Sequence, residues 1–365
     1  MLLFKTRPLN VEYKPGTYVK EFDGWRGIGI CFVVLAHYFP TYFIGSWVFM
    51  EMFFVMSGFL ITGILLDSKS RTGYYRKFIS RRIVRVFPLY YLCLALLFFL
   101  LPHSWLDLDY YRQHQAWFWL YGENWLYSIQ GWPKVKALHH FWSLAIEEQF
   151  YIVWPLVVYL FSIKGLARFC VFLFFFSLFF RNIGMPWLGF VMPFPYVATL
   201  GRMEPIALGA LIAILVRTDK TVLERYTVRA TWIAGILSAS CFVIARSAFF
   251  EKPIHYMINY TLVDVFFAGL ITMTLDGSRM PLFRRLLNHR FSREVGIMSY
   301  CLYIFHYPIE DIIQVNYLAP LQQYTGSENL GKLLCLAIAL AITIPVVYLV
   351  HKKVEVPFWK LKRYF

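Results

Sequence analysis

Arg26 and His37 stand eleven positions apart in an apolar stretch, DGWRGIGICFVVLAHY, which begins at Asp23. At 100° per residue, eleven steps make three turns and about 20°, so in a helix the two side chains share one face, about 16.5 Å apart. Asp23 falls within about 40° of the same face. A deep imidazole can remove a proton or carry a transferred group, or it can be a buried histidine bonded to a neighbouring helix. The stretch by itself leaves both interpretations open.

Three arginines introduce another apolar run, ISRRIVRVFPLYYL. Arginine forks bind phosphate groups through two parallel hydrogen bonds, so Arg81, Arg82 and Arg85 are candidates for binding an anion. Basic residues at a membrane surface also serve as ordinary anchors. Arg85 lies further into the apolar run than an anchor requires, which favours anion binding.

A pair of carboxylates, Glu147 and Glu148, lies about two turns inside the apolar run HHFWSLAIEEQFYIVWP. An ionisable group at the middle of a membrane costs roughly 2.5–3.5 kcal/mol on insertion scales, so the pair predicts a functional role. Ser143, Glu147 and Tyr151 are spaced by four and share one helix face. Either glutamate could pair with an arginine or an imidazole, or take part in acid–base catalysis.

Other polar residues in apolar runs are more ambiguous. Ser57 and Gly58 in FFVMSGFLIT allow another helix to approach closely. We favour this packing role over a serine nucleophile, because no G-x-S-x-G elbow surrounds Ser57. Glu204, near the outer end of one apolar run, and His306, a second intramembrane histidine, are further candidates for contact with the substrate. The candidate substrate contacts are Ser143, Tyr151, Glu204 and His306.

The composition indicates a membrane protein. Of the 365 residues, 59% are hydrophobic and 16% are charged, and the mean hydropathy is +0.54, whereas soluble domains average about 25% charged residues. Runs of about 20 apolar residues are long enough to cross a bilayer as helices. We predict an all-α, polytopic membrane protein with about ten transmembrane helices: 25–44, 47–66, 83–101, 140–161, 166–181, 197–216, 229–247, 258–275, 296–315 and 330–351.

Charge predicts the orientation of these spans. With both termini in the cytoplasm, most of the 36 lysines and arginines fall in cytoplasmic segments, as the positive-inside rule requires. The formal net charge of +15 then reports topology and contact with anionic membrane lipids rather than binding to nucleic acid. Residues 102–138 are too polar to span and predict an interfacial or re-entrant segment. Residues 1–22 are polar and basic without a cleavable signal, so we expect the first span to direct insertion.

The six cysteines all fall within or at the ends of apolar runs and form no CxxC or Cys/His pattern. We expect them to be small buried apolar side chains. We also expect no metal site, because no cluster of ligand residues has metal-binding spacing.

Six motifs, taken in order, resemble the acyltransferase-3 family of membrane proteins, which O-acylate cell-surface glycans. The motifs are DGWRGIGICFVVLAH, FFVMSGFLIT, RRIVRVFPLYYL, HHFWSLAIEEQFYIVWP, MSYCLYIFHYPI and VEVPF. The family's arginine-x10-histidine motif falls on Arg26 and His37, and its RxxR motif falls on Arg82 and Arg85. Trp25 stands where leucine is commoner. The resemblance implies an acyltransferase domain over residues 23–358, between cytoplasmic tails at 1–22 and 359–365.

The resemblance further implies acyl transfer across the inner (plasma) membrane. The expected donor is cytoplasmic acetyl-CoA, and the expected acceptor is a hydroxyl of an extracytoplasmic glycan or lipid-linked glycan, such as O-antigen. His37 would be the general base or would carry the acyl group itself, and the CoA phosphates would bind the motif arginines. The implied donor-binding residues are Arg26, Arg82 and Arg85, and the implied catalytic residues are His37, Asp23, Glu147 and Glu148.

Two other classes of protein stay open. A transporter or flippase of a lipid-linked glycan also places polar groups around a midplane cavity, but the sequence has no internal repeat and its arginines gather at one face. A structural scaffold would not need a buried histidine and buried glutamates. No esterase-like domain of the kind that some family members carry is seen, so we expect a stand-alone transferase. The acceptor, and whether the acyl group is acetyl or longer, stay open.

Overall fold

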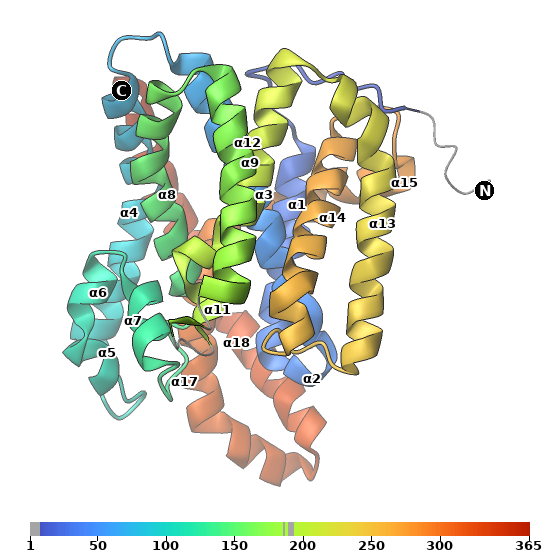
Figure 1. Cartoon of the computed structure of the whole chain (residues 1–365). Coiled ribbons are helices and arrows are strands. Elements are labelled where there is room, and N and C mark those ends of the chain that lie inside the picture. Colours follow the sequence, from blue (N-terminus) through green and yellow to red (C-terminus); the bar gives the residue numbers. More distant parts are fainter. Residues whose placement is uncertain (1–7, 185–186, 189–192) are drawn as a thin grey trace.

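The protein is a bundle of helices (Figure 1). The structure is a computed structural model that describes residues 8–184, 187–188 and 193–365, and these residues contain no strand. The long helices are α1 (Glu21–Tyr38), α3 (Val48–Ser68), α4 (Tyr74–Ala95), α8 (Phe141–Leu160), α9 (Ile163–Phe179), α12 (Met203–Thr218), α13 (Thr221–Ala245), α14 (Tyr260–Thr274), α17 (Ser299–Thr325) and α18 (Glu328–Val350). Each predicted span coincides with one of these helices, so the all-α prediction is confirmed.

Shorter elements connect and extend the long helices. The short helices are α2 (Pro40–Phe43), α5 (Asp109–Gln113), α6 (Gln115–Trp119), α7 (Glu123–Gln130), α11 (Phe194–Val197), α15 (Pro281–Asn288), α16 (Arg290–Ile297) and α19 (Val356–Lys360). Tighter turns form η1 (Ile44–Trp47), η4 (Thr199–Arg202) and η7 (Leu361–Tyr364), and wider π turns form η2 (Leu96–Leu100), η3 (Phe180–Gly184), η5 (His255–Asn259) and η6 (His351–Glu355).

Seven helical segments of the described chain have the length and hydropathy needed to cross a membrane. They contain α3, α4, α9, α12, α13, α14 and α18. The three remaining long helices, α1, α8 and α17, are the ones that carry the predicted histidines, glutamates and Asp23. Polar groups lower the hydropathy of these three helices, and the number of ten spans therefore stays a prediction.

Several predicted boundaries are wrong: α17 continues to Thr325 rather than residue 315, and α13 begins at Thr221 rather than residue 229. The first span was expected to continue to residue 44, but α1 ends at Tyr38 and α2 begins at Pro40. Proline disfavours helical geometry at the residue before it, and Phe39 accordingly leaves the helical region at φ −126° and ψ 61°. The third span was expected to begin at residue 83, but α4 begins at Tyr74, directly after Gly73 at φ +72°. The motif arginines therefore lie on the helix itself rather than in the preceding loop.

Close helix packing explains the Ser57-Gly58 pair. A Cβ atom added to Gly58 would lie 2.1 Å from the carbonyl oxygen of Ile206 on α12. On the other side of the same contact, a Cβ on Gly209 would lie 2.0 Å from the carbonyl oxygen of Val55 on α3. Small residues thus allow α3 and α12 to touch backbone to backbone, as predicted.

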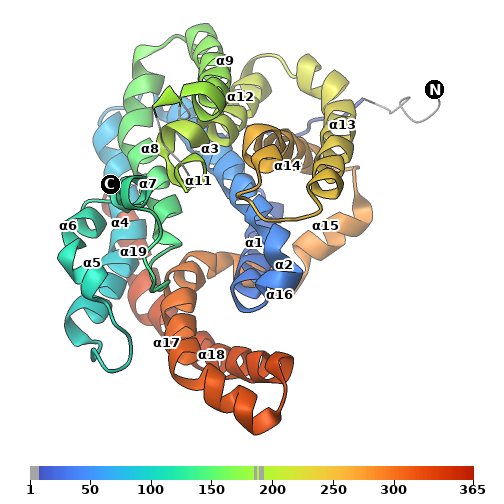
Figure 2. The same ribbon diagram turned by 60° about the horizontal axis from the view of Figure 1, so that its bottom comes forward.

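The two ends of the bundle differ. Residues 8–20 and the C-terminus lie at the same end, whereas α5, α6 and α7 lie beside α4 towards the other end (Figure 1). The long α17–α18 hairpin projects beyond the other helices at that second end (Figure 2). An even number of spans would bring residues 8–20 and the C-terminus to the same end, and this end is the one predicted to face the cytoplasm.

Candidate active site

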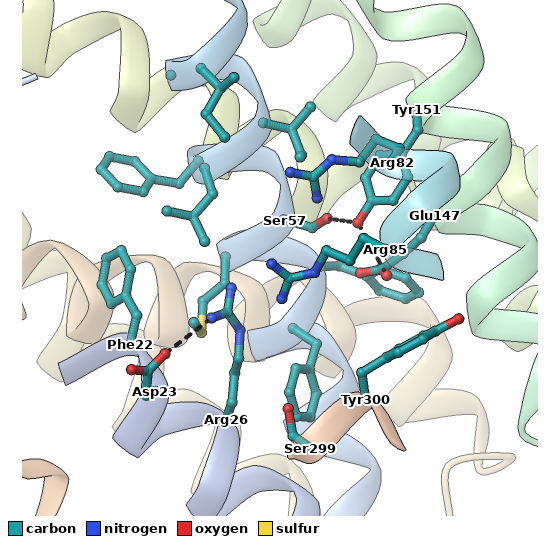
Figure 3. Close-up of a pocket in the computed structure, with 18 of the residues that line it drawn as sticks. Phe22, Asp23, Arg26, Ser57, Arg82, Arg85, Glu147, Tyr151, Ser299 and Tyr300 are labelled. Atoms are coloured by element: carbon teal, nitrogen blue, oxygen red, sulfur yellow. Dashed lines mark hydrogen bonds and ion pairs between the residues drawn. The ribbon is translucent and has the colours of Figure 1, made fainter. Parts of the chain in front are cut away.

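A cavity of about 460 Å³ lies among α1, α3, α4, α8 and α17, beside residues 13–19 of the N-terminal segment. Its size falls within the range of about 300–1,000 Å³ that is usual for ligand sites. Figure 3 shows Asp23 and Arg26 of α1 on one side of it, with Arg82 and Arg85 of α4 reaching in from the other. The cavity is therefore built from the helices that carry the sequence motifs.

Four arginines line the cavity, and two of them have no ion pair among the described residues. Arg217 Nη2 lies 2.7 Å from Asp67 Oδ2. Arg26 Nη1 lies 3.5 Å from Asp23 Oδ1, whereas neither Arg82 nor Arg85 has a carboxylate within 4 Å among the described residues. The buried Nε of Arg82 also has no hydrogen-bond partner there. Unpaired guanidinium groups around a cavity favour a ligand that carries several negative charges.

The three candidate arginines of helix α4 point in two different directions. Arg82 and Arg85 are three residues apart and therefore share a face, and both line the cavity. Arg81 is exposed, and its Nη2 donates to the carbonyl oxygen of Phe365, 2.7 Å away. The structure thus brings two of the three sequence candidates into the site and turns the third towards the C-terminus.

The stripe predicted on α8 lines the same cavity. Ser143, Glu147 and Tyr151 all face it, together with Glu148. The hydroxyl of Tyr151 donates to Glu147 Oε2 at 3.3 Å and lies 3.1 Å from Ser57 Oγ (Figure 3). Polar groups on α3 and α8 therefore give the cavity wall acceptors and donors beside Arg82, whose guanidinium group lies 5.5 Å from the centre of the Tyr151 ring.

Asp23 lies at the same end as the arginines. Its carboxylate accepts a hydrogen bond from the hydroxyl of Tyr18, in the N-terminal segment, and faces Arg26. The structure places this aspartate in the wall of the cavity, where it holds Arg26 and the N-terminal segment, and does not bring it to His37. Its predicted catalytic role thus has no contact with the imidazole.

The cavity ends at a hydrogen-bonded pair between α8 and α17. Ser143 Oγ lies 2.7 Å from the hydroxyl of Tyr303, and both groups reach the carbonyl oxygen of His140, at 3.1 and 2.8 Å. Tyr303 lines the cavity on one side. On the other side its ring lies 5.0 Å from that of His140 and 5.8 Å from that of His306.

A histidine cluster, defined here as His37, His140 and His306, begins where the cavity ends. The Nδ1 atom of His37 lies 3.1 Å from His306 Nε2, and the rings of His140 and His306 are 5.2 Å apart. Glu310 Oε2 lies 3.7 Å from the same Nδ1 of His37, and Tyr307 stacks on the His37 ring at 3.8 Å. Pairing with an imidazole was one of the roles left open for Glu147 and Glu148, but the carboxylate within ion-pair distance of His37 is that of Glu310.

Residues 132–139 lie against the histidine cluster. The backbone N–H of Lys136 donates to Asp311 Oδ2 at 2.9 Å, and the rings of Trp132 and His139 stack at 4.8 Å. Burial lowers the pKa of His139 to about 4, so this imidazole is neutral at neutral pH. The segment predicted to be interfacial or re-entrant thus ends beside His37.

Glu204 lies in a separate group of buried charges. It is paired with Arg181, and Thr261 donates to it at 2.7 Å. Nearby, Glu51 pairs with Arg202, and all four charged side chains are at most 1% exposed. Glu204 does not line the cavity described above, because its helix turns that residue towards η3 and α14. The structure therefore gives no support for the predicted substrate contact at Glu204.

Sequence analysis missed several residues of the site. Tyr303 and Glu310 stand three and four residues from His306 and therefore lie on the same helix face. Tyr307 is the next residue in the chain. An acid one turn from an intramembrane histidine is a signal that the sequence offered. His140 stands in the quoted HHFWSL motif, and its position between two helices has no local sequence signature.

One surface group has the composition of a metal site. His103, Asp107 and Asp109 lie close together, and all three are exposed. His103 Nδ1 and Arg112 Nη1 lie 3.6 and 3.7 Å from Asp109 Oδ1, so ion pairs account for this grouping. Exposed acids often gather in this way without a metal.

The fold and the site define a membrane-embedded helical bundle with a cationic cavity at one end and a histidine cluster at the inner limit of that cavity. Comparison of the sequence with protein families identifies an acyltransferase domain over residues 19–352. The chain belongs to the acyltransferase-3 family. It is a multi-pass membrane protein.

Several curated proteins are similar to this chain. O-acetyltransferase OatA of Staphylococcus aureus is 28% identical over 333 residues, which are 84% of this chain and 53% of that protein. Peptidoglycan O-acetyltransferase OatA of Listeria monocytogenes is 27% identical over 312 residues, 80% of this chain and 49% of that protein. The chain thus spans about half the length of these relatives. No solved structure matches it.

Proposed function

We propose that the protein transfers an acetyl group from cytoplasmic acetyl-CoA to a hydroxyl of an extracytoplasmic glycan, in the plasma membrane. The observation that carries this proposal is the placement of two unpaired arginines, Arg82 and Arg85, in a cavity whose inner limit adjoins His37 and its partners. The arginines at the cytoplasmic end could bind the charged phosphates of the donor. The imidazole beyond them could act on the uncharged acyl group.

The donor end is supported by charge. CoA carries several phosphate charges, and Arg26, Arg82 and Arg85 face the cavity from two helices. Guanidinium groups bind phosphates bidentately, and the partly buried setting of the cavity strengthens such contacts relative to bulk water. The pantetheine arm would extend past Ser143 and Tyr303 towards the histidine cluster.

The chemistry needs a base near the thioester. His37 would take the proton of the acceptor hydroxyl as the oxygen attacks the acyl carbon, and the CoA thiolate would leave with that proton. Alternatively, the imidazole of His37 could accept the acyl group first and then pass it to the acceptor. Glu147 bonds to Tyr151 and lines the cavity with the arginines. In this proposal it therefore contacts the donor and does not act on His37.

The acceptor end is supported by position. His37 lies near the end of α1 opposite the arginines, and residues 132–139 contact the cluster from the extracytoplasmic side expected from charge. The Listeria relative is described as a peptidoglycan O-acetyltransferase. We therefore propose a surface glycan as the acceptor class, with peptidoglycan, O-antigen and other polysaccharides as the candidates to test.

The test uses purified full-length protein in nanodiscs with acetyl-CoA radiolabelled in the acetyl group. We expect wild-type protein to release CoA and to label an added glycan acceptor, and His37→Ala to lose both while still binding CoA. A protein that binds CoA but labels no glycan in a panel of envelope polysaccharides contradicts the acceptor class. Wild-type turnover in His37→Ala contradicts the catalytic assignment, and absence of CoA binding contradicts the donor.

A further inference from the structure

The backbone fixes which nitrogen of His306 carries its proton. His306 Nδ1 lies 3.0 Å from the carbonyl oxygen of Leu302 and 2.8 Å from that of Tyr303. Carbonyl oxygens only accept hydrogen bonds, so Nδ1 must be the N–H of the ring. His306 is 2% exposed and has no carboxylate within 4 Å among the described residues, which disfavours a second proton. Its Nε2 is therefore an acceptor.

That tautomer determines the tautomer of His37. His37 Nδ1 lies 3.1 Å from the acceptor Nε2 of His306. A hydrogen bond between the two rings requires one proton, and only His37 can supply it, so His37 carries its proton on Nδ1. The lone pair of a neutral His37 is then on Nε2, the nitrogen on the far edge of the ring.

Glu310 is poised beside the same N–H. The side chain is 1% exposed; Oε1 accepts from Gln314 Nε2 at 2.9 Å, while Oε2 is buried without a hydrogen-bond partner. This Oε2 lies 3.7 Å from His37 Nδ1. A buried oxygen without a partner is costly, and its position suggests what it stabilises: the imidazolium that forms when Nε2 gains a proton.

We propose that His306 and Glu310 are positioning residues that hold His37 in the Nδ1–H tautomer, so that Nε2 of His37 is the reacting atom. This inference rests on the proposed function. When the acceptor oxygen attacks the acyl carbon, its proton passes to Nε2; the carbon–sulfur bond breaks, and the CoA thiolate takes that proton from Nε2. Glu310 balances the charge of the ring between the two transfers, and Tyr307, stacked at 3.8 Å, holds its plane.

Other charged and titratable groups surround the pair. Asp311 is nearest to Glu310 in the chain, and it accepts a backbone hydrogen bond from Lys136 instead of facing His37. The groups near His37 or Glu310 on the packed elements are Tyr38 on α1, Lys136, His139 and His140 before α8, and His306, Tyr307 and Asp311 on α17. Cys335 on α18 lies near Tyr38.

The kinetic test compares two isosteric changes on neighbouring residues. We expect Glu310→Gln to lower kcat by at least about tenfold with an unchanged KM for acetyl-CoA. The acidic limb of its pH–rate profile should move to lower pH, because the imidazolium has lost its carboxylate. Asp311→Asn is the comparison variant: it removes a neighbouring charge that does not contact His37, so it should shift the profile less than Glu310→Gln does. Glu310→Gln with wild-type kcat and profile overturns the role of Glu310.

The role of His306 has its own pair of variants. His306→Phe keeps a ring and removes the acceptor, whereas His306→Gln offers an amide oxygen in its place. We expect the first to lose kcat and the second to recover part of it. Equal activity of the two variants contradicts the tautomer argument. Thermal unfolding in detergent confirms that each variant is folded.

A spectroscopic test does not depend on turnover. The chain has nine histidines, so the nitrogen-15 NMR signals of histidine-labelled protein can be assigned to His37 by comparison with His37→Ala. We expect His37 to show a protonated Nδ1 and an unprotonated Nε2, and His306→Phe to lose this preference. A protonated Nε2 in the wild type overturns the inference. Turnover in His37→Ala would instead overturn the proposed function and leave the tautomer result standing.

Discussion

The hydroxyl of Tyr303 lies 2.7 Å from Ser143 Oγ, at the point where the arginine-lined cavity meets the histidine cluster. Tyr303 belongs to α17 and Ser143 to α8, and both also bond to the carbonyl oxygen of His140. His37 itself does not line the cavity. In the proposed function, an acyl group that moves from the arginines to His37 would pass this pair of hydroxyls.

We expect the pair to act as a unit in turnover. A hydrogen bond of this kind contributes about 0.5–1.5 kcal/mol, so Tyr303→Phe and Ser143→Ala should each change kcat by roughly two- to tenfold. Because each variant removes the same contact, the double variant should differ little from either single one. The measurement is kcat and KM for acetyl-CoA in the four proteins of the cycle. Effects that multiply in the double variant would show that the two hydroxyls act independently.

A second prediction concerns the donor site. We expect Arg82→Ala and Arg85→Ala each to weaken CoA binding by about 10- to 100-fold, since hydrogen bonds to charged groups contribute about 1.5–3 kcal/mol. Calorimetric titration of CoA into nanodisc-embedded protein measures the affinity. Arg81→Ala is the matched control, because Arg81 is on the same helix but bonds to Phe365.

Salt provides an independent check of the same site. Added salt screens charge interactions at a partly open site, so raising the ionic strength should weaken wild-type binding more than that of Arg82→Ala. If Arg81→Ala weakened CoA binding as much as Arg85→Ala, general surface charge rather than a specific phosphate contact would account for the affinity.

Sequence periodicity predicts the cavity better than it predicts the histidine cluster. Arg82 with Arg85, and Glu147 with Tyr151, follow from helix faces alone, because residues three or four apart lie together on a helix. These side chains do line one cavity. The sequence also places Arg26 and His37 on one helix, and α1 runs through both positions.

The partners of His37 depend on how α1 packs against α17. That packing is set by side chains and glycines along several helices. The spacing of Glu310 from His306 predicts a shared helix face but not that His37 meets them, and no local signature marks His140. The same limit applies to Glu204, whose partner Arg181 is 23 residues away across α11. Spacing identifies which face of a helix is polar, but the identity of the facing helix comes from tertiary packing.

Glu204 is expected to stabilise the fold rather than to contact the substrate. Glu204→Ala leaves Arg181 as a buried cation without its carboxylate, and breaking a buried ion pair in this way typically costs about 3–5 kcal/mol. We expect a marked loss of folded protein and a lower melting temperature, with unchanged CoA affinity in the fraction that folds. Thermal unfolding followed by size-exclusion chromatography in detergent measures the first two quantities.

A paired replacement tests the reason for that loss. Arg181→Met combined with Glu204→Leu removes both charges, and apolar pairs of similar volume often restore stability. Recovery should be partial, because Arg181 also donates to the carbonyl oxygens of Tyr256 and Gly201 and to Thr261. If Glu204→Ala instead folded like the wild type and raised the KM for the acceptor, Glu204 would be a substrate contact, because loss of uniform binding raises KM at constant kcat.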